Sequence, residues 1–163
     1  MRTNVRGRLA ATALIAAALA VGAPALAMKS RPSAPPPTPT ETRPLGGIKL
    51  AATLTGAVEV PPGDPAGSGT FSARLNPGHD QLCYDLAVSN IATPTAAHIH
   101  RGGPGVSGPP VVMLQAPANG SVSACAAVTP AVADEILANP GGFYVNVHNA
   151  AFPGGALRGQ LTR

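Results

Sequence analysis

The stretch Gln81-Leu82-Cys83-Tyr84-Asp85-Leu86-Ala87-Val88-Ser89 decides the fold class, because large apolar or aromatic residues occupy every second position. In a β-strand, residues two apart point to the same face. One face of this segment would therefore be apolar from 82 to 88, while Asp85 and Ser89 would lie on the other face. Such alternation is typical of a half-buried strand in an antiparallel sheet.

Further short β-type runs surround this stretch and are separated by turns rich in Pro, Gly and Asn. These runs are 48–60, 69–75, 95–100, 111–114, 121–128, 143–148 and 156–162. One short helix is predicted near 130–138, because Thr129 suits an N-cap and Pro130 the first helical position. Val132, Ile136 and Leu137 would face the core. Together these features predict an all-β fold, an antiparallel β-sandwich of Greek-key-like type with one helix.

The N-terminal region predicts export. Basic residues precede an apolar run from Leu9 to Ala23, and Ala25-Leu26-Ala27 follows as a small-x-small cleavage site. Residues 1–27 are therefore predicted to be a signal peptide, with an uncleaved N-terminal anchor as the alternative. Residues 28–47 form a proline-rich linker, and 48–163 the folded domain. The expected location is the periplasm, the cell envelope or the extracellular space, with no stable membrane span after cleavage.

The charge of the chain comes mainly from this targeting segment. The formal net charge is +4, but three of the eleven basic residues lie in 1–27, which leaves eight basic and seven acidic residues afterwards. The chain contains no tryptophan, and aromatic residues make up 3% of it. Without a basic stripe or aromatic residues for base stacking, nucleic-acid binding is excluded.

The cysteines are Cys83 and Cys125. In an exported protein such a pair favours a disulfide, which would close a loop of about 40 residues and contribute about 3–4 kcal/mol. A metal-binding or reactive thiol is the alternative, but neither cysteine lies in a CxxC pair or beside a histidine.

Three histidines form the candidate site. His98 and His100 would point to the same face of one strand, and His148 ends a second strand. Three imidazoles suit copper, zinc or nickel, and a metal site predicts nitrogen atoms within about 4–5 Å of one another before metal binds. Two alternatives remain open. The imidazoles could hydrogen-bond carbonyls of loop 101–110 and orient turn 152–155, or they could act in acid–base catalysis.

Arg158 is the candidate buried cation. It lies among apolar neighbours, so we expect it to be buried and to bind a carboxylate or several backbone carbonyls. Glu59 and Asp85 are the candidate carboxylates, in a structural rather than a catalytic role. The glycine-rich run 102–110 lacks the lysine or following helix of a phosphate site, which favours a long turn.

Four blocks of the chain resemble the chordin-type (CHRD) domain. They are 54–62 (LTGAVEVPP), 97–108 (beginning AHIH), 144–149 (YVNVHN) and 152–161 (FPGGALRGQL). The resemblance implies a secreted all-β domain, and many bacterial members carry a cysteine pair where Cys83 and Cys125 stand. Bacterial members are mostly single-domain exported proteins without an assigned activity. The chain lacks the cysteine-rich repeats that bind ligands in chordins, so growth-factor antagonism is not implied.

The leading hypothesis is thus an exported CHRD-type module that binds an unknown ligand or envelope component, with His98, His100 and His148 as its candidate site. A copper- or zinc-binding protein in metal handling is the alternative. The histidine pattern also resembles the copper half of a copper–zinc superoxide dismutase, another β-sandwich. That enzyme needs a fourth copper histidine, a bridging ligand and a zinc cluster. The sequence offers one further histidine, His79, and none of the other ligands, so an enzyme of this kind is the third and least favoured hypothesis.

Overall fold

A computed structural model describes residues 46–163, so the predicted signal peptide (1–27) and nearly all of the predicted linker (28–47) lie outside the described residues. The described part contains eight strands, one α-helix and two short 3-10 helices. The strands are β1 (Ile48–Thr55), β2 (Ser68–Asn76), β3 (Gln81–Ser89), β4 (Pro94–Arg101), β5 (Pro110–Leu114), β6 (Ser121–Ala127), β7 (Phe143–Asn149) and β8 (Leu157–Gln160). The helices are α1 (Pro130–Ala138), η1 (Pro77–His79) and η2 (Pro140–Gly142).

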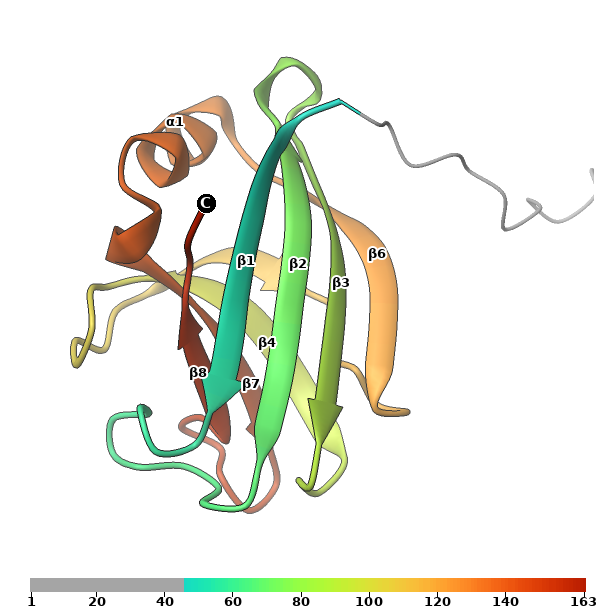
Figure 1. Cartoon of the computed structure of the whole chain (residues 1–163), viewed down its shortest axis with the longest axis vertical. Coiled ribbons are helices and arrows are strands. Elements are labelled where there is room, and N and C mark those ends of the chain that lie inside the picture. Colours follow the sequence, from blue (N-terminus) through green and yellow to red (C-terminus); the bar gives the residue numbers. More distant parts are fainter. Residues whose placement is uncertain (1–45) are drawn as a thin grey trace, which may run out of the picture. The chain divides into compact units, whose positions relative to one another are not determined.

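All the strands pair antiparallel in one sheet with the order β5-β4-β7-β8-β1-β2-β3-β6. The sheet folds over, so that β1, β2, β3 and β6 form one layer in front of β4, β7 and β8 (Figure 1). The layers join where Thr55 of β1 pairs with Arg158 of β8, with a separate bridge between Ala51 and Thr162. The all-β prediction is confirmed, and the sandwich is a single, nearly closed sheet.

The return of β7 to β4 gives the topology its Greek-key-like character. The chain leaves β4, forms the β4–β5 hairpin, crosses to β6 beside β3, and comes back to pair β7 with β4. A strand that returns by a long connection to an earlier one is the defining step of that motif. This return brings residues near 98 and residues near 148 onto neighbouring strands.

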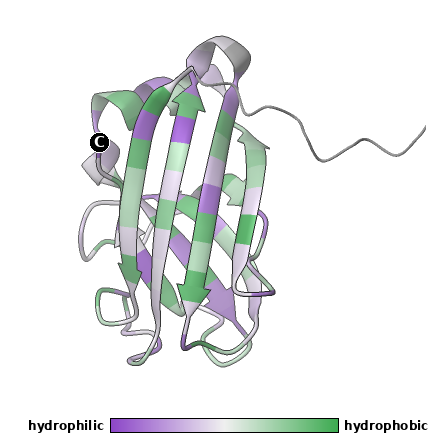
Figure 2. Ribbon diagram, turned by 45° about the vertical axis from the view of Figure 1, so that its right-hand side comes forward, coloured by the Kyte–Doolittle hydropathy of each residue, from purple (hydrophilic) through white to green (hydrophobic). Residues whose placement is uncertain are grey.

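The core lies between the two layers. Along β3, Leu82, Tyr84 and Leu86 are buried, as the alternation predicts. Hydrophobic and hydrophilic residues alternate along the strands in Figure 2. The back layer contributes its own inward residues, Ala97 and Ile99 of β4, Val145 and Val147 of β7, and Leu157 of β8, all fully buried. Burial of these apolar side chains supplies the main stabilisation of the fold.

A disulfide joins Cys83 to Cys125, as predicted. The two residues lie directly opposite each other on β3 and β6. It therefore fastens β6, which ends the sheet, to its neighbour. The bond closes a loop across 42 residues of sequence, which restricts the unfolded chain.

The helix α1 forms where the sequence predicts it. The Thr129 hydroxyl accepts a hydrogen bond from the Val132 amide and Pro130 occupies the first turn. Ile136 is buried as expected, together with Ala133, whereas Val132 and Leu137 are partly buried. Within residues 46–163, no helix has the length and apolar character needed to cross a membrane.

Candidate metal site

The candidate site lies on the outer face of the back layer. Because Ala97 and Ile99 point into the core, His98 and His100 point away from it. The register of β4 and β7 places Asn146 opposite His98 and Tyr144 opposite His100. His148 lies two residues beyond Asn146 on the same face, diagonally across from His98. The topology therefore brings all three predicted histidines to one place.

The ligand nitrogen atoms of the three histidines, one from each ring, all lie within 4.8 Å of one another. The ring centroids of His98 and His148 are 5.0 Å apart, those of His98 and His100 5.5 Å, and those of His100 and His148 6.1 Å. All three side chains are half-buried. These separations match the spacing expected of a metal site before the ion draws its ligands together.

Hydrogen bonds to backbone carbonyls decide which ring nitrogens carry protons. Nδ1 of His100 lies 2.8 Å from the Gly108 carbonyl oxygen, and Nδ1 of His148 lies 3.1 Å from that of Pro153. A carbonyl can only accept, so each Nδ1 donates, and in the neutral ring each Nε2 keeps a bare lone pair. The structural interpretation of the sequence is correct to this extent, since His100 contacts loop 101–110 and His148 contacts turn 152–155.

His98 differs from the other two because its ring bonds to another histidine. Its Nδ1 lies 3.2 Å from Nε2 of His148. Since His148 Nε2 is the acceptor, Nδ1 of His98 donates in the metal-free protein. Moving that proton from Nδ1 to Nε2 of His98 would leave Nδ1 free to bind a metal.

Burial keeps two of the imidazoles neutral. Loss of solvent around His98 lowers its pKa below the usual value, and His148 and His100 lower it further. Burial is also the main cause that lowers the pKa of His148. The hydrogen bond to the Pro153 carbonyl and the charge of Glu59 raise this pKa, whereas His100 lowers it further. The site thus favours uncharged imidazoles, the form that binds metal ions.

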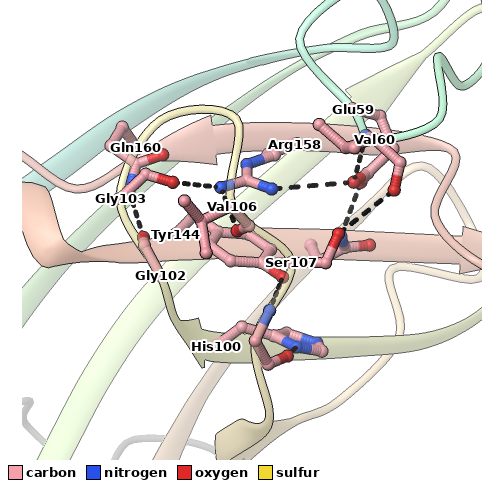
Figure 3. Close-up of polar contacts among 12 residues, drawn as sticks. Glu59, Val60, His100, Gly102, Gly103, Val106, Ser107, Tyr144, Arg158 and Gln160 are labelled. Atoms are coloured by element: carbon pink, nitrogen blue, oxygen red, sulfur yellow. Dashed lines mark hydrogen bonds and ion pairs between the residues drawn. The ribbon is translucent and has the colours of Figure 1, made fainter.

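A layer of buried polar residues continues the site across β7 and β8. Glu59 reaches over from the loop after β1, where its Oε2 accepts a hydrogen bond from the Asn146 side chain at 2.5 Å. Its Oε1 accepts from the Val60 amide at 2.9 Å and lies 3.9 Å from Nη1 of Arg158. Glu59, Asn146 and Arg158 are all at least 96% buried. Figure 3 shows Arg158 between Glu59 on one side and Gly103 of the glycine-rich loop on the other.

Arg158 holds the glycine-rich loop in place. Its Nη2 donates to the carbonyls of Gly103 and Val106 at 2.8 and 2.9 Å. The loop thus directs carbonyl oxygens, which accept hydrogen bonds, at the Arg158 cation. A phosphate site would direct N–H donors at its ligand, so the loop serves Arg158 and not a phosphate. The residues after Arg158 assist, because Gln160 donates to the carbonyls of Gly102 and Gly141.

The Tyr144 ring lies between Arg158 and His100 (Figure 3). The guanidinium carbon of Arg158 is 3.5 Å from the ring centroid, and the His100 ring stacks on Tyr144 at 5.0 Å with planes inclined by 16°. The Tyr144 hydroxyl accepts a hydrogen bond from the Gly108 amide. Tyr144 therefore connects the buried ion pair to the histidine cluster through ring contacts.

The other candidate partner of Arg158, Asp85, belongs to the opposite layer. It points outward from β3, because its neighbours Tyr84 and Leu86 point into the core. Its carboxylate accepts a hydrogen bond from Ser123 of β6. The core separates the two outward faces, so Arg158 pairs with Glu59 instead. Arg101, at the start of the glycine-rich loop, forms an exposed ion pair with Glu135 of α1 at 2.6 Å.

The sequence interpretation missed Asn146 and Tyr144 as site residues. Both alternate with the core residues Val145 and Val147, so they lie on the same face as His148. That alternation in Tyr144-Val145-Asn146-Val147-His148 was the available signal. It was insufficient because nothing local shows that loops cover the outer face of β7.

The donor set fits a transition metal. Ligating histidines commonly donate their second N–H to a backbone carbonyl, as His100 and His148 do here. Three nitrogen ligands with a fourth open position are typical of copper and zinc sites. Within residues 46–163, this cluster is the one group of three or more His, Cys, Asp or Glu side chains with metal-ligating spacing.

Comparison with known proteins identifies the domain. The family model described as "CHRD domain" matches residues 50–161, more than half of the chain. No curated protein and no solved structure gives a significant match. The family match covers most of β1, all of β2 to β8, and all three clustered histidines.

Proposed function

Because the chain belongs to the CHRD domain family, we propose that it is an exported module that binds one copper or zinc ion through His98, His100 and His148. The site belongs to the sheet and not to a mobile appendage, since His98 and His100 lie on β4 and His148 on β7. Binding of the ion is the activity that the geometry supports best.

One observation carries this proposal. Nε2 of His100 is buried and has no hydrogen-bond partner among the described residues. Because its Nδ1 donates to the Gly108 carbonyl, this nitrogen presents a lone pair and no proton. A buried acceptor without a partner costs about 1–3 kcal/mol. A metal ion shared with His98 and His148 would satisfy it.

Export is part of the proposal. The described domain contains the Cys83–Cys125 disulfide, which is typical of oxidising compartments. The basic and apolar N-terminal segment of 1–27 has the composition of a signal peptide. The periplasm, the cell envelope and the extracellular space all meet these conditions.

The metal-binding interpretation explains more than a structural role alone. Structural hydrogen bonds account for Nδ1 of His100 and of His148, but they leave Nε2 of His100 unused. They also give no reason for His98, whose ring bonds to His148 at 3.2 Å.

Metal titration of the full chain tests the proposal. Isothermal titration with Cu(II) and with Zn(II) should give one site, and His98→Gln should weaken binding by at least about tenfold. His98 is the best position because neither of the two loops depends on it for a backbone hydrogen bond. His79→Gln is the matched control, since His79 belongs to η1 in the opposite layer and should leave affinity unchanged. Equal affinity in H98Q, or no binding to the unmodified chain, would refute the proposal.

A further inference from the structure

The register of β4 and β5 adds a sulfur atom to the candidate site. Met113 lies directly opposite His98 in this pairing. Residues opposite each other in an antiparallel pair share a face, with Cβ atoms about 4.5–5.5 Å apart. The alternation along β5 agrees, because Val112 and Leu114 on either side of Met113 are buried in the core. Met113 therefore stands on the outer face, next to His98.

Met113 is also the most exposed large apolar side chain of the described residues, at 66%. The outward positions nearest to it on β4 and β7 are polar, with His98 and Asn146 in one cross-strand row. Methionine is unbranched and has three rotatable side-chain bonds, so its thioether can swing toward a neighbour without moving the backbone. No packing against the core restrains it.

We infer that Met113 is a fourth ligand of the proposed site and that the ion it serves is copper in its monovalent state. This inference rests on the proposed function. Thioether sulfur is a soft donor that selects Cu(I), whereas zinc sites use nitrogen, oxygen and thiolate. Three imidazoles and one thioether form a donor set in which copper is favoured over zinc.

The charges around the cluster favour a monovalent ion as well. All four proposed ligands are neutral, so none offsets the charge of the metal. The nearby carboxylate, Glu59, is already engaged by Asn146, the Val60 amide and Arg158. Arg158 adds a positive charge behind Tyr144, on the far side of that ring from His100. In a half-buried setting a single positive charge is less costly than two.

A Cu(I) competition assay tests Met113 directly. The full chain, kept anaerobic with ascorbate, competes with the chromophoric Cu(I) chelator bicinchoninate. Met113→Leu preserves size and removes the sulfur, and we expect it to weaken Cu(I) binding by about tenfold or more. The same variant should keep its Zn(II) affinity within about twofold. Val58→Leu, which alters another exposed apolar side chain, is the matched control and should change neither affinity.

A second measurement reports on the sulfur itself. Peroxide oxidises an exposed methionine to its sulfoxide, and mass spectrometry of the Met113 peptide measures the extent. Bound Zn(II) should leave this oxidation rate unchanged, because zinc would not recruit the thioether. A redox-inert Ag(I) ion, which prefers the same soft donors as Cu(I), should slow it severalfold.

The two proposals fail in different ways. Unchanged Cu(I) affinity in M113L, or a chain that binds Zn(II) but not Cu(I), overturns the assignment of Met113 and copper while the histidine site stands. A chain that binds none of Cu(I), Cu(II) and Zn(II) overturns the histidine site itself.

Discussion

Glu59 and Asn146 are 87 positions apart in the sequence, yet the Glu59 carboxylate accepts a hydrogen bond from the Asn146 amide at 2.5 Å. Glu59 comes from the loop after β1 and Asn146 from the centre of β7. This contact places a negative charge above the back layer, where Arg158 needs a counter-ion. It thus fixes the loop over the same face that carries the histidines.

Removing the charge of Glu59 should destabilise the fold strongly. Glu59→Gln keeps the shape of the side chain but leaves the buried Arg158 without an anion. We expect a loss of about 3 kcal/mol in the free energy of unfolding, measured by urea denaturation. Glu135→Gln breaks the exposed pair with Arg101 and should cost less than about 1 kcal/mol. Similar losses in both variants would contradict the buried ion pair.

Gly155 should tolerate no side chain. It has φ of 148°, and a Cβ atom there would overlap Oε2 of Glu59. Gly155→Ala should therefore cost about 2 kcal/mol or more, because either the loop or Glu59 must shift. Its neighbour Gly154 has no atom within 4 Å of the added Cβ. Gly154→Ala should change stability by less than about 0.5 kcal/mol, and a thermal melt distinguishes the two.

The metal-free protein should lose stability as the pH falls below 6.5. Folding lowers the pKa of His98 and of His148 from that value, so the unfolded chain binds more protons in this window. Stability contributed by the neutral rings is complete above pH 6.5 and declines as the pH falls toward the folded pKa values. Carboxylates titrate too, so the measurement is the difference between the unmodified chain and H98Q across the window. A difference that stays constant with pH would contradict the lowered pKa of His98.

Replacing both cysteines should destabilise the domain without harming the site. The disulfide closes 42 residues of sequence, so Cys83→Ala with Cys125→Ala should lose about 3–4 kcal/mol. Cys83 and Cys125 lie on β3 and β6, in the layer opposite the histidines. Under conditions where the variant stays folded, its Zn(II) affinity should match that of the unmodified chain. A parallel loss of affinity would show that the two layers are coupled.

The strand pattern and the histidine cluster could be predicted from the sequence for the same reason. Both depend on period-two alternation, which is local: it shows in 81–89 and puts His98 and His100 on one face. The helix was equally local, since Thr129, Pro130 and the Asn139-Pro140-Gly141 stop are adjacent to it. Predicting the disulfide between Cys83 and Cys125 required one further inference, namely that the protein is exported.

The buried polar layer could not be predicted in this way. Arg158 was recognised as a cation that must be paired, but the choice between Glu59 and Asp85 depends on which layer each strand joins. Asn146 and Tyr144 alternate with the core residues of β7, so the pattern places them on the outer face. Their burial comes from loops that are far away in the sequence. Nothing in the local sequence singles out Met113 either, because its position beside His98 depends on the register between β4 and β5.

The two edge strands of the folded-over sheet affect how readily concentrated protein molecules aggregate. The strands β5 and β6 each have one side without a hydrogen-bonded neighbour in the sheet, and the fold brings them against each other. Open strand sides are the places where one protein molecule can add to another and begin a fibre. Because β5 and β6 lie close together and a disulfide fastens β6 to β3, the domain leaves less room for a strand of another molecule to pair there. This protection of the sheet edges follows from the fold alone and does not depend on metal binding.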